Sequence, residues 1–253
     1  MADLPLQAVR GVLTHTGMWG TARVVVLAAV AALSCSSAPP ASPGTQNSAQ
    51  QQLVDRSSDA LVRMHDSGRF PALGYYLSNA KGVMIFPRVI KAGLMLGGQG
   101  GNGVLVARRA DGSWSAPAFY GLGGGSAGAQ IGFQEASVVL CFMSQSALRS
   151  AIDRGLTLGT DASVAAGTLG DSGKAVARTS ARDIYQFVNV GGLFAGVSLA
   201  GTVVSSRSSF NRAYYGPSAT TRGIVIQGRF DNPGAARLKQ TLATFSTAEV
   251  AGN

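Results

Sequence analysis

Apolar residues follow two different periods along the chain. Between positions 53 and 64 they recur near the helical period, and Asp55, Arg56, Asp59 and Arg63 lie on the other side. That spacing predicts an amphipathic helix. From position 82 onward the apolar residues instead form short runs separated by glycine, which is typical of β-strands. These runs cover 82–87, 92–97, 103–108, 114–120, 127–134 and 137–143.

Turn and capping signals predict the remaining elements. Asp111-Gly112 indicates a turn ahead of the fourth strand, and Gly100-Gly101-Asn102-Gly103 indicates one between the second and third strands. Two further strands are expected at 156–166 and 193–204, on either side of a polar connection. Short helices are expected at 72–79, 144–154, 208–215, 221–227 and 235–245.

Glycine is concentrated in the predicted strands. A glycine cluster fills residues 116–132, and the pattern small-Gly-x-x-apolar-small recurs at 92–97, 127–132 and 195–201. Glycine inside strands marks bends and close approach of neighbouring backbone. No βαβ alternation is visible, which argues against a parallel sheet. We therefore expect an α+β fold with a strongly curved, Gly-rich, mainly antiparallel β-sheet or barrel-like core, an N-terminal amphipathic helix and short C-terminal helices.

Charge and cysteine content narrow the classes of partner. The 253-residue chain has a formal net charge of +9, yet Arg and Lys are scattered singly. Without a basic run, a nucleic-acid partner is not expected, whereas attraction to anionic surfaces stays open. The two cysteines, Cys35 and Cys141, are too few for a disulfide framework or a cysteine metal site. We expect no metal and no cofactor.

The N-terminal segment has the features of a secretory leader. An apolar run at 24–33 follows Arg23 and is too short to span a bilayer. Residues 1–34 are therefore expected to be a signal peptide, with Met18 as an alternative start. The segment ending at Cys35 resembles a bacterial lipoprotein box, so we favour lipidation of Cys35 over ordinary cleavage near it. Ser36 favours the outer membrane, and residues 35–52 are expected to form a flexible tether after the anchor.

Two glycine motifs resemble cofactor-binding or catalytic loops. Residues 98–103 and 123–128 match GxGxxG, but strand-like residues follow where a dinucleotide site needs a helix. Ser126 lies in a GxSxG motif, which requires a histidine base, normally later in the chain. The two histidines, His15 and His65, both precede it. The sequence therefore predicts that the protein is not an enzyme.

Three other reactive side chains have structural interpretations. Cys141 lies inside an apolar run and is expected to be an inert core residue. Asp161 and Asp171 flank a Gly/Ala-rich segment and could bind a cation, although capping and turn roles are commoner there.

Basic residues and the amphipathic helix remain as candidates for function. Lys81, Arg88 and Lys91 bracket the first predicted strand and could form one cluster for phosphate headgroups. Solvated charges at the rim of the sheet are the competing interpretation. The helix could likewise lie on lipid or simply cover the core.

Five segments of the core resemble one known family. In chain order they are KGVMIFPRVIKAGLMLGGQGGNGVLVAR from Lys81, WSAPAFYGLGGGSAGAQIGFQ from Trp114, LTLGTDASVAAG from Leu156, GLFAGVSLAG from Gly192 and NRAYYG from Asn211. Together they are similar to the SYLF family of lipid-binding domains. The resemblance covers a single domain at 53–246, which leaves a tail at 247–253. It implies binding of phosphoinositide or other anionic lipid without catalysis and, in fungal relatives, binding of actin.

The resemblance also implies where lipid would be bound. The family's amphipathic segment falls on residues 53–64, and its basic strand ends fall on Lys81, Arg88 and Lys91. We therefore expect lipid contacts from the residues Leu53, Arg56, Leu61, Arg63, Met64, Lys81, Arg88 and Lys91. We expect the protein at the bacterial cell envelope, lipid-anchored at the outer membrane and facing the periplasm. The leader argues against actin. The alternative function is a structural envelope lipoprotein whose sheet docks a partner protein.

Overall fold

The computed structural model describes residues 48–94, 96–127, 132–158, 164–167, 183–191, 199 and 201–247. The expected signal peptide, Cys35, most of the expected tether, Asp161, Asp171 and the expected C-terminal tail lie outside these residues. Seven helical segments are described: α1 (Ala49–Asp66), α2 (Leu73–Asn79), α3 (Gln145–Arg154), α4 (Ser208–Tyr215), α5 (Thr221–Val225), the 3₁₀ turn η1 (Pro233–Ala235) and α6 (Ala236–Thr247). The strands are β1 (Gly82–Leu94), β2 (Leu96–Ala107), β3 (Ala118–Ala127), β4 (Gly132–Phe142), β5 (Leu156–Thr157), β6 (Val164–Gly167), β7 (Ile184–Gly191) and β8 (Val203–Ser206).

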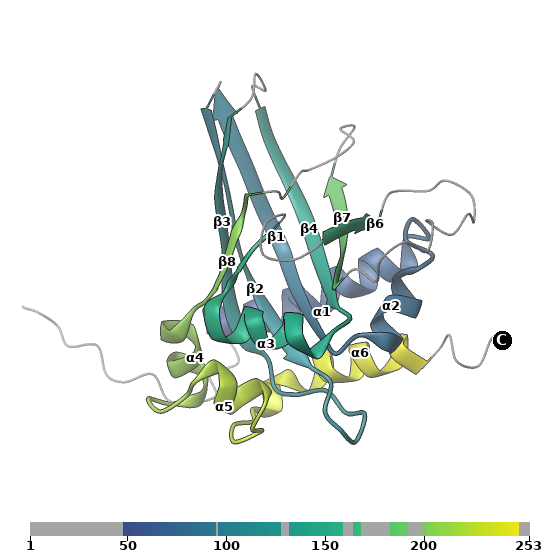
Figure 1. The fold of residues 1–253 in the computed structure, drawn as a ribbon, viewed down its shortest axis with the longest axis vertical. Coiled ribbons are helices and arrows are strands. Elements are labelled where there is room, and N and C mark those ends of the chain that lie inside the picture. Colours follow the sequence, from purple (N-terminus) through teal and green to yellow (C-terminus); the bar gives the residue numbers. More distant parts are fainter. Residues whose placement is uncertain are drawn as a thin grey trace, which may run out of the picture. The chain divides into compact units, whose positions relative to one another are not determined.

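The described strands form one curled sheet in the order β5-β8-β3-β2-β1-β4-β7-β6 (Figure 1). All neighbours are antiparallel except β6 and β7, which pair in parallel. The long strands β1 to β4 lie at the centre, and the short strands lie at the edges. The expected α+β class with a strongly curved, mainly antiparallel sheet is confirmed.

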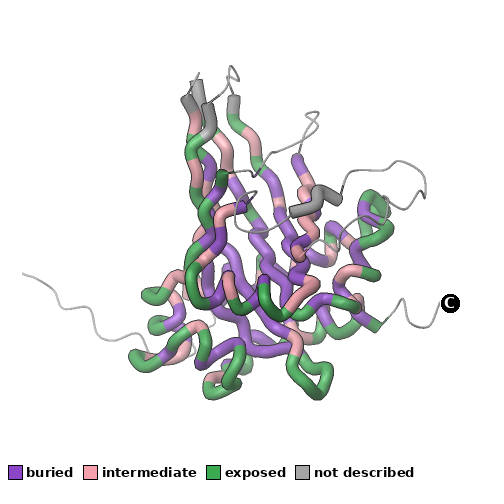
Figure 2. The backbone as a smooth tube through the Cα atoms, viewed as in Figure 1, coloured by how far each residue is buried: buried purple, intermediate pink, exposed green. Residues whose placement is uncertain are grey.

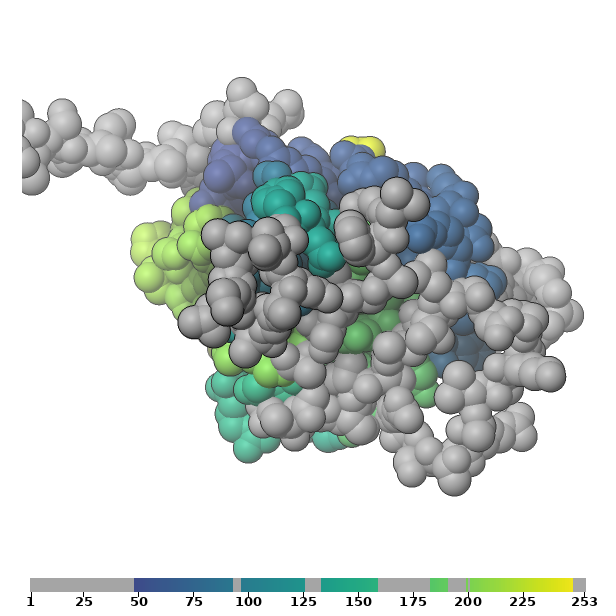
Figure 3. Space-filling model, turned by 90° about the horizontal axis from the view of Figure 1, so that it is seen from above, coloured from purple at the N-terminus to yellow at the C-terminus, as the bar shows by residue number. Residues whose placement is uncertain are grey.

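Helices cover both faces of the sheet at one end of the long strands. The views in Figures 1 and 3 place α1 on one face and α3 on the other. One buried cluster joins α3 and α5 to the sheet through Leu148, Ile152 and Ile224, and a second joins α1, α2 and α6 through Leu61 and Leu238. Figure 2 shows that buried positions concentrate in this helix-covered part, whereas the far ends of the strands are more exposed.

The amphipathic pattern produces α1 as expected. Ser48 caps the helix by accepting a hydrogen bond from the Gln51 N–H at 3.1 Å, which satisfies one of the free donors of the first turn. Leu61 and Met64 are fully buried against the sheet and α6. Full burial of a side chain of this size stabilises the fold by about 1.5–3 kcal/mol. The helix is therefore held mainly by its apolar face.

The glycine run in β2 is not a turn. The expected turn at Gly100–Gly103 is wrong, because these residues lie inside β2: Gly100 to Asn102 pair with both β1 and β3, and Gly103 pairs with β3. Pro87 interrupts β1 opposite them, where a bulge shifts the register against both neighbouring strands. Proline lacks the N–H that a central strand needs, so a bulge at this point is the expected accommodation. A Cβ at Gly103 would collide with the Ile85 carbonyl oxygen and the Phe86 ring.

Strand boundaries differ from the sequence expectation in other places as well. The run expected at 127–134 includes the end of β3 and the start of β4, and the run expected at 156–166 includes β5 and the start of β6. The runs at 82–87 and 92–97 are expected as separate strands, but β1 continues from the first run to Leu94, and residues 96–97 already belong to β2. Strand β7 was not expected; it lies beyond the polar connection and pairs with β4 along its whole length. The strand expected at 193–204 lies mostly outside the described residues. Its end overlaps β8.

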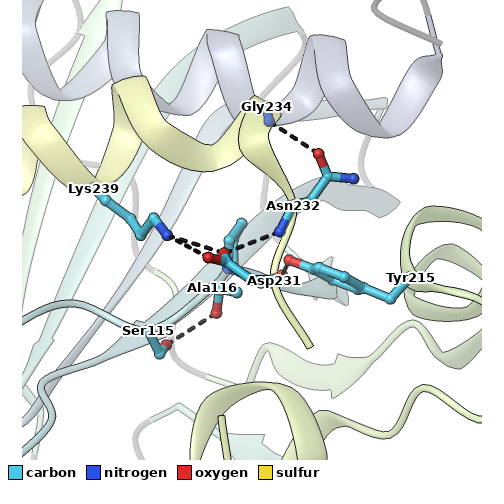
Figure 4. A network of polar contacts seen from close by, with 8 residues as sticks. Ser115, Ala116, Tyr215, Asp231, Asn232, Gly234 and Lys239 are labelled. Carbon is cyan, nitrogen blue, oxygen red and sulfur yellow. Dashed lines mark hydrogen bonds and ion pairs between the residues drawn. The ribbon is translucent and has the colours of Figure 1, made fainter. Parts of the chain in front are cut away.

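A polar network anchors the C-terminal helices (Figure 4). Lys239 Nζ donates to the Asp231 carboxylate at 2.9 Å, and the Asn232 N–H donates to the same carboxylate. Asn232 Oδ1 in turn accepts from the Gly234 N–H and so caps η1. Burial alone would raise the pKa of Asp231, but these hydrogen bonds and the Lys239 charge hold it below its usual value. The network orients α6 across the end of the sheet.

Candidate anion-binding cleft

An open cleft of about 720 Å³ lies beside the N-terminal half of α1 and is lined by residues of β1, β2, β3 and β8. Its cationic residues are Arg56 from α1, Arg88 from β1 and Arg207 from the β8–α4 junction. No acidic side chain belongs to its lining among the described residues. Four glycines and five apolar residues complete it: Gly100, Gly101, Gly121, Gly123, Leu53, Pro87, Ile90, Leu122 and Val203; Asn102 and Ser205 add polar groups.

Arg207 is held in a defined position. Its Nη1 donates to Asn102 Oδ1 at 2.5 Å, and its guanidinium carbon lies 4.0 Å from the centre of the Phe210 ring. The backbone of Gly121 lies beneath its side chain: a Cβ there would be 3.5 Å from Arg207 Cδ. A guanidinium already oriented by stacking and by one hydrogen bond loses less freedom when it binds an anion.

The other two arginines reach the cleft from different elements. Arg56 is exposed on α1, where its Nη2 donates to Gln52 Oε1 at 3.1 Å. Arg88 follows the Pro87 bulge in β1, and its Nε donates to Glu135 Oε2 on β4 at 2.8 Å. The bulge matters here because it shifts the alternation of β1. Arg88 and Ile90 therefore face the cleft, while Val89 packs into the core on the other face.

Glycine keeps the floor of the cleft open. A Cβ at Gly123 would meet no atom within 4 Å. Packing therefore does not require glycine at this position, and the missing side chain leaves the backbone exposed to the cleft. Gly101 is different, because a Cβ there would collide with the Arg88 carbonyl oxygen. One glycine thus allows β2 to pack on the bulge, and another leaves space for a ligand.

The structure brings together three of the residues expected to bind lipid. Leu53, Arg56 and Arg88 all line the cleft. Arg207 and Asn102 were missed. In the sequence, Arg207 lies between an expected strand and an expected helix, and Asn102 lies in the expected turn at Gly100–Gly103, which the structure does not form. A basic residue at a strand–helix junction was the available signal for Arg207, but only the fold shows that this junction lies opposite α1.

The other expected basic residues do not join this cluster. Lys81 precedes β1 and lies roughly 23 Å of extended strand from Arg88. Lys91 follows Ile90, so strand alternation places it on the opposite face of the sheet. Arg63 is exposed on α1 about 10 Å further along the helix than Arg56. The expected single cluster of Lys81, Arg88 and Lys91 is therefore not formed.

The apolar face of α1 is largely unavailable in this conformation. Leu61 and Met64 are 0% exposed and pack on the sheet and on α6. Leu53 is also mostly buried but borders the cleft. The expectation that this face meets lipid thus applies here only to Leu53, because the core already occupies the other two side chains.

The geometry also bears on the catalytic interpretations. Residues 98–103 lie within β2, which continues to Ala107, and residues 123–127 of the second glycine motif lie within β3. The next described element after that motif is strand β4, from Gly132. Cys141 is fully buried, and burial raises the pKa of its thiol well above its usual value. Within the described ranges, no group of three His, Cys, Asp or Glu residues could hold a metal ion. In that same part of the chain, no helix is long and apolar enough to cross a membrane.

These features define an α+β domain whose curled antiparallel sheet carries a cationic, glycine-floored cleft. Residues 123–245 match the family model described as "Ysc84: Las17-binding protein actin regulator". The chain carries a SYLF domain of this Ysc84 family, as the core segments suggested.

Curated relatives support the same assignment. Protein YSC84 of Saccharomyces cerevisiae is 39% identical over 166 residues, which are 64% of this chain and 35% of that protein. The yeast LAS seventeen-binding protein 3 is 38% identical over 163 residues, covering 63% and 35%. The human SH3 domain-containing YSC84-like protein 1 is 38% identical over 144 residues, covering 56% and 42%. This chain therefore spans about a third of the yeast relatives and under half of the human one.

Proposed function

We propose that this protein binds anionic phospholipid without catalysis, and that the phosphate of the headgroup lies in the cleft. The observation that carries the proposal is the convergence of Arg56, Arg88 and Arg207 from three separate segments on one open cleft. Guanidinium groups present paired donors that match phosphate oxygens, and charge-assisted hydrogen bonds of this kind are among the strongest in proteins.

The composition of the cleft favours a lipid over a small inorganic anion. Ile90 and Val203 supply apolar surface beside the arginines, and the exposed fraction of Val203 is 51%. A volume of about 720 Å³ exceeds what a lone phosphate would fill. A headgroup with its glycerol unit and the first part of an acyl chain uses both the cationic and the apolar surface.

The proposal extends to where the protein resides. Attachment of acyl chains at Cys35 would tether the domain to a bacterial envelope membrane, and the polar segment at 35–52 would let the cleft reach lipid headgroups. Anchorage at the outer membrane on its periplasmic side is the location that the leader favours. Mass spectrometry of the mature N-terminus tests it: an unmodified terminus that lacks Cys35 would overturn the anchor.

Vesicle flotation tests the lipid binding. The full-length chain carrying Cys35→Ala removes any acyl anchor, and vesicles of phosphatidylcholine alone or with phosphatidylglycerol supply the membrane. We expect flotation to require the anionic lipid and to weaken with salt. Arg207→Gln should weaken it by on the order of tenfold, the effect of losing a charge-assisted contact. Arg149→Gln is the matched control, because Arg149 is exposed on α3 at the opposite face of the sheet.

Two results would count against the proposal. Equal flotation with neutral and anionic vesicles would show that charge does not drive binding. An equal loss for Arg207→Gln and Arg149→Gln would show that net charge matters and the cleft does not.

A second candidate function is the docking of a partner protein. The relatives' printed names include LAS seventeen-binding, and an aromatic surface offers a place for such a contact. Tyr75 is 54% exposed beside Tyr76, which stacks on Tyr185 with ring centres 4.1 Å apart. Exposed aromatics are enriched where proteins dock. Loss of a co-purifying envelope protein on Tyr75→Ala, with vesicle binding unchanged, would favour this candidate.

A further inference from the structure

One of the three cleft arginines is already paired with a carboxylate. Arg88 Nε donates to Glu135 Oε2 at 2.8 Å, and both side chains are about half exposed. Within the part of the chain that the structure describes, the other two have neutral partners at the cleft: Gln52 for Arg56 and Asn102 for Arg207. The three arginines are therefore not equally free to receive an anion.

Glu135 is placed to compete with a ligand. It lies on β4 next to β1, one strand away from the cleft floor, and reaches Arg88 across the bulge. A carboxylate and a phosphate oxygen accept the same guanidinium N–H groups. A phosphate that engages Arg88 through Nε must therefore displace Glu135, and Glu135 then remains nearby as a like charge.

We propose that Glu135 is an internal counter-anion that occupies Arg88 in the empty cleft and so sets how tightly the cleft holds a phosphate group. This inference rests on the proposed function, because it concerns the same cleft. Binding becomes an exchange of one anion for another at Arg88, while Arg56 and Arg207 receive the ligand directly. Glu135 is a positioning residue that acts through Arg88, and the sequence did not indicate it, since its partner lies 47 residues earlier.

A double-mutant cycle on vesicles of phosphatidylcholine with phosphatidylglycerol tests the exchange. All variants carry Cys35→Ala in the full-length chain. We expect Glu135→Gln to tighten binding roughly two- to fivefold, the fold-change equivalent to one exposed ion pair. Arg88→Gln should weaken binding by on the order of tenfold. In the Arg88→Gln background, Glu135→Gln should change vesicle binding little, because the effect of Glu135 on binding acts through Arg88.

The matched control removes a similar ion pair elsewhere. Asp153 pairs with Arg222 at 2.7 Å, and both side chains are about half exposed, as in the Arg88–Glu135 pair. Asp153→Asn changes net charge by the same amount as Glu135→Gln but lies away from the cleft lining. It should leave vesicle binding within about twofold of the parent if only long-range charge is altered.

The possible outcomes separate this inference from the proposed function. If the parent binds and Arg207→Gln weakens it, but Glu135→Gln behaves like Asp153→Asn, the counter-anion role is overturned and lipid binding stands. An equal gain from Glu135→Gln with and without Arg88 also overturns the role. If the parent does not bind anionic vesicles, both ideas fail.

An inorganic phosphate arm identifies the source of the bound group. A lipid headgroup site should lose little vesicle binding in millimolar inorganic phosphate. Full displacement at that concentration, together with saturable binding of phosphate by the vesicle-free protein, would overturn the lipid assignment and indicate a free phosphate ligand.

Discussion

Strands β1 and β2 run through two regions of different character. In the helix-covered half, Val83 to Phe86 are fully buried and pair with Val104 to Val106 or with β4. In the other half, Arg88 to Ala92 pair with the glycine-rich segment Gly98 to Asn102. The first half has apolar side chains on both faces of the sheet. The second has exposed backbone, a cationic cleft and a bulge at its boundary.

The difference shows how one sheet can serve both packing and binding. Side chains fill the space between sheet and helices in the first half, and their burial contributes most of the stability. In the second half, glycine withholds side chains, which leaves room for a ligand against the backbone. Pro87 lies where one region changes to the other, because the bulge that it requires turns Arg88 toward the cleft.

The largest expected effect is in the helix-covered half. Leu61→Ala should reduce the free energy of unfolding by about 2–5 kcal/mol, because it leaves a cavity beneath α1. Urea denaturation measures it, and Val203→Ala, at an exposed position in the other half, should stay within about 0.5 kcal/mol. Small loss of stability for Leu61→Ala with strong loss of vesicle binding would instead assign Leu61 to lipid contact.

Substitution at the boundary between the two regions should reduce the free energy of unfolding by nearly as much. Gly103→Ala should cost about 1–3 kcal/mol, because the added methyl group collides with the Ile85 carbonyl oxygen and the Phe86 ring. Gly123→Ala, where space is open, should be close to neutral in the same denaturation experiment. Equal losses of stability from the two substitutions would contradict the distinction between Gly103, which close packing requires, and Gly123, which lies in open space on the cleft floor.

A third prediction concerns the cleft floor alone. Gly123→Leu should fill the floor and weaken binding to anionic vesicles by on the order of tenfold, or about 1.4 kcal/mol. Gly125→Leu is the matched control: a Cβ at Gly125 also meets no atom within 4 Å, but this residue is not part of the cleft lining. Binding that survives Gly123→Leu would place the ligand elsewhere.

The smallest expected effect is in the polar contacts of the helical layer. The pKa of Asp231 is held below its usual value, so Asp231 contributes stability above about pH 4, where it is ionised in both states. That contribution is lost as pH falls through the lowered pKa. Asp231→Asn should cost at most about 1 kcal/mol at pH 7, because the Asp231 side chain is 64% exposed, and the cost should shrink as pH falls through the lowered pKa. A cost independent of pH would contradict this.

Local patterns predicted much of the fold. The helical period found α1, the turn at Asp111-Gly112 is confirmed by a positive φ at Gly112, and the short C-terminal helices lie where the spacing placed them. Glycine density correctly indicated a curved antiparallel sheet. Glycine density gave a wrong prediction at Gly100–Gly103, because a glycine-rich segment is compatible both with a turn and with a strand that packs on a bulge. Strand β7 was missed since its pairing with β4 is long-range.

The candidate site could be predicted only in part. Arg56 and Arg88 were identified because their charges stand out beside a helix and a strand, and Leu53 because it belongs to the amphipathic face. Lys81 and Lys91 were grouped with Arg88 by closeness in sequence, which says nothing of distance along a strand or of which face a side chain takes after a bulge. Basic residues that are close in sequence therefore lie apart in the folded structure.

The amino-acid sequence by itself determined the family, the fold class and the segments from which the structure is built, because these depend on local spacing and composition. Tertiary structure alone decided which residues meet. It buried Leu61 and Met64 in the core, and it brought Arg207 beside Asn102 from 105 positions away. The physical reason is that strand register, the bulge at Pro87 and helix packing set side-chain positions in space, and all three depend on contacts between distant parts of the chain.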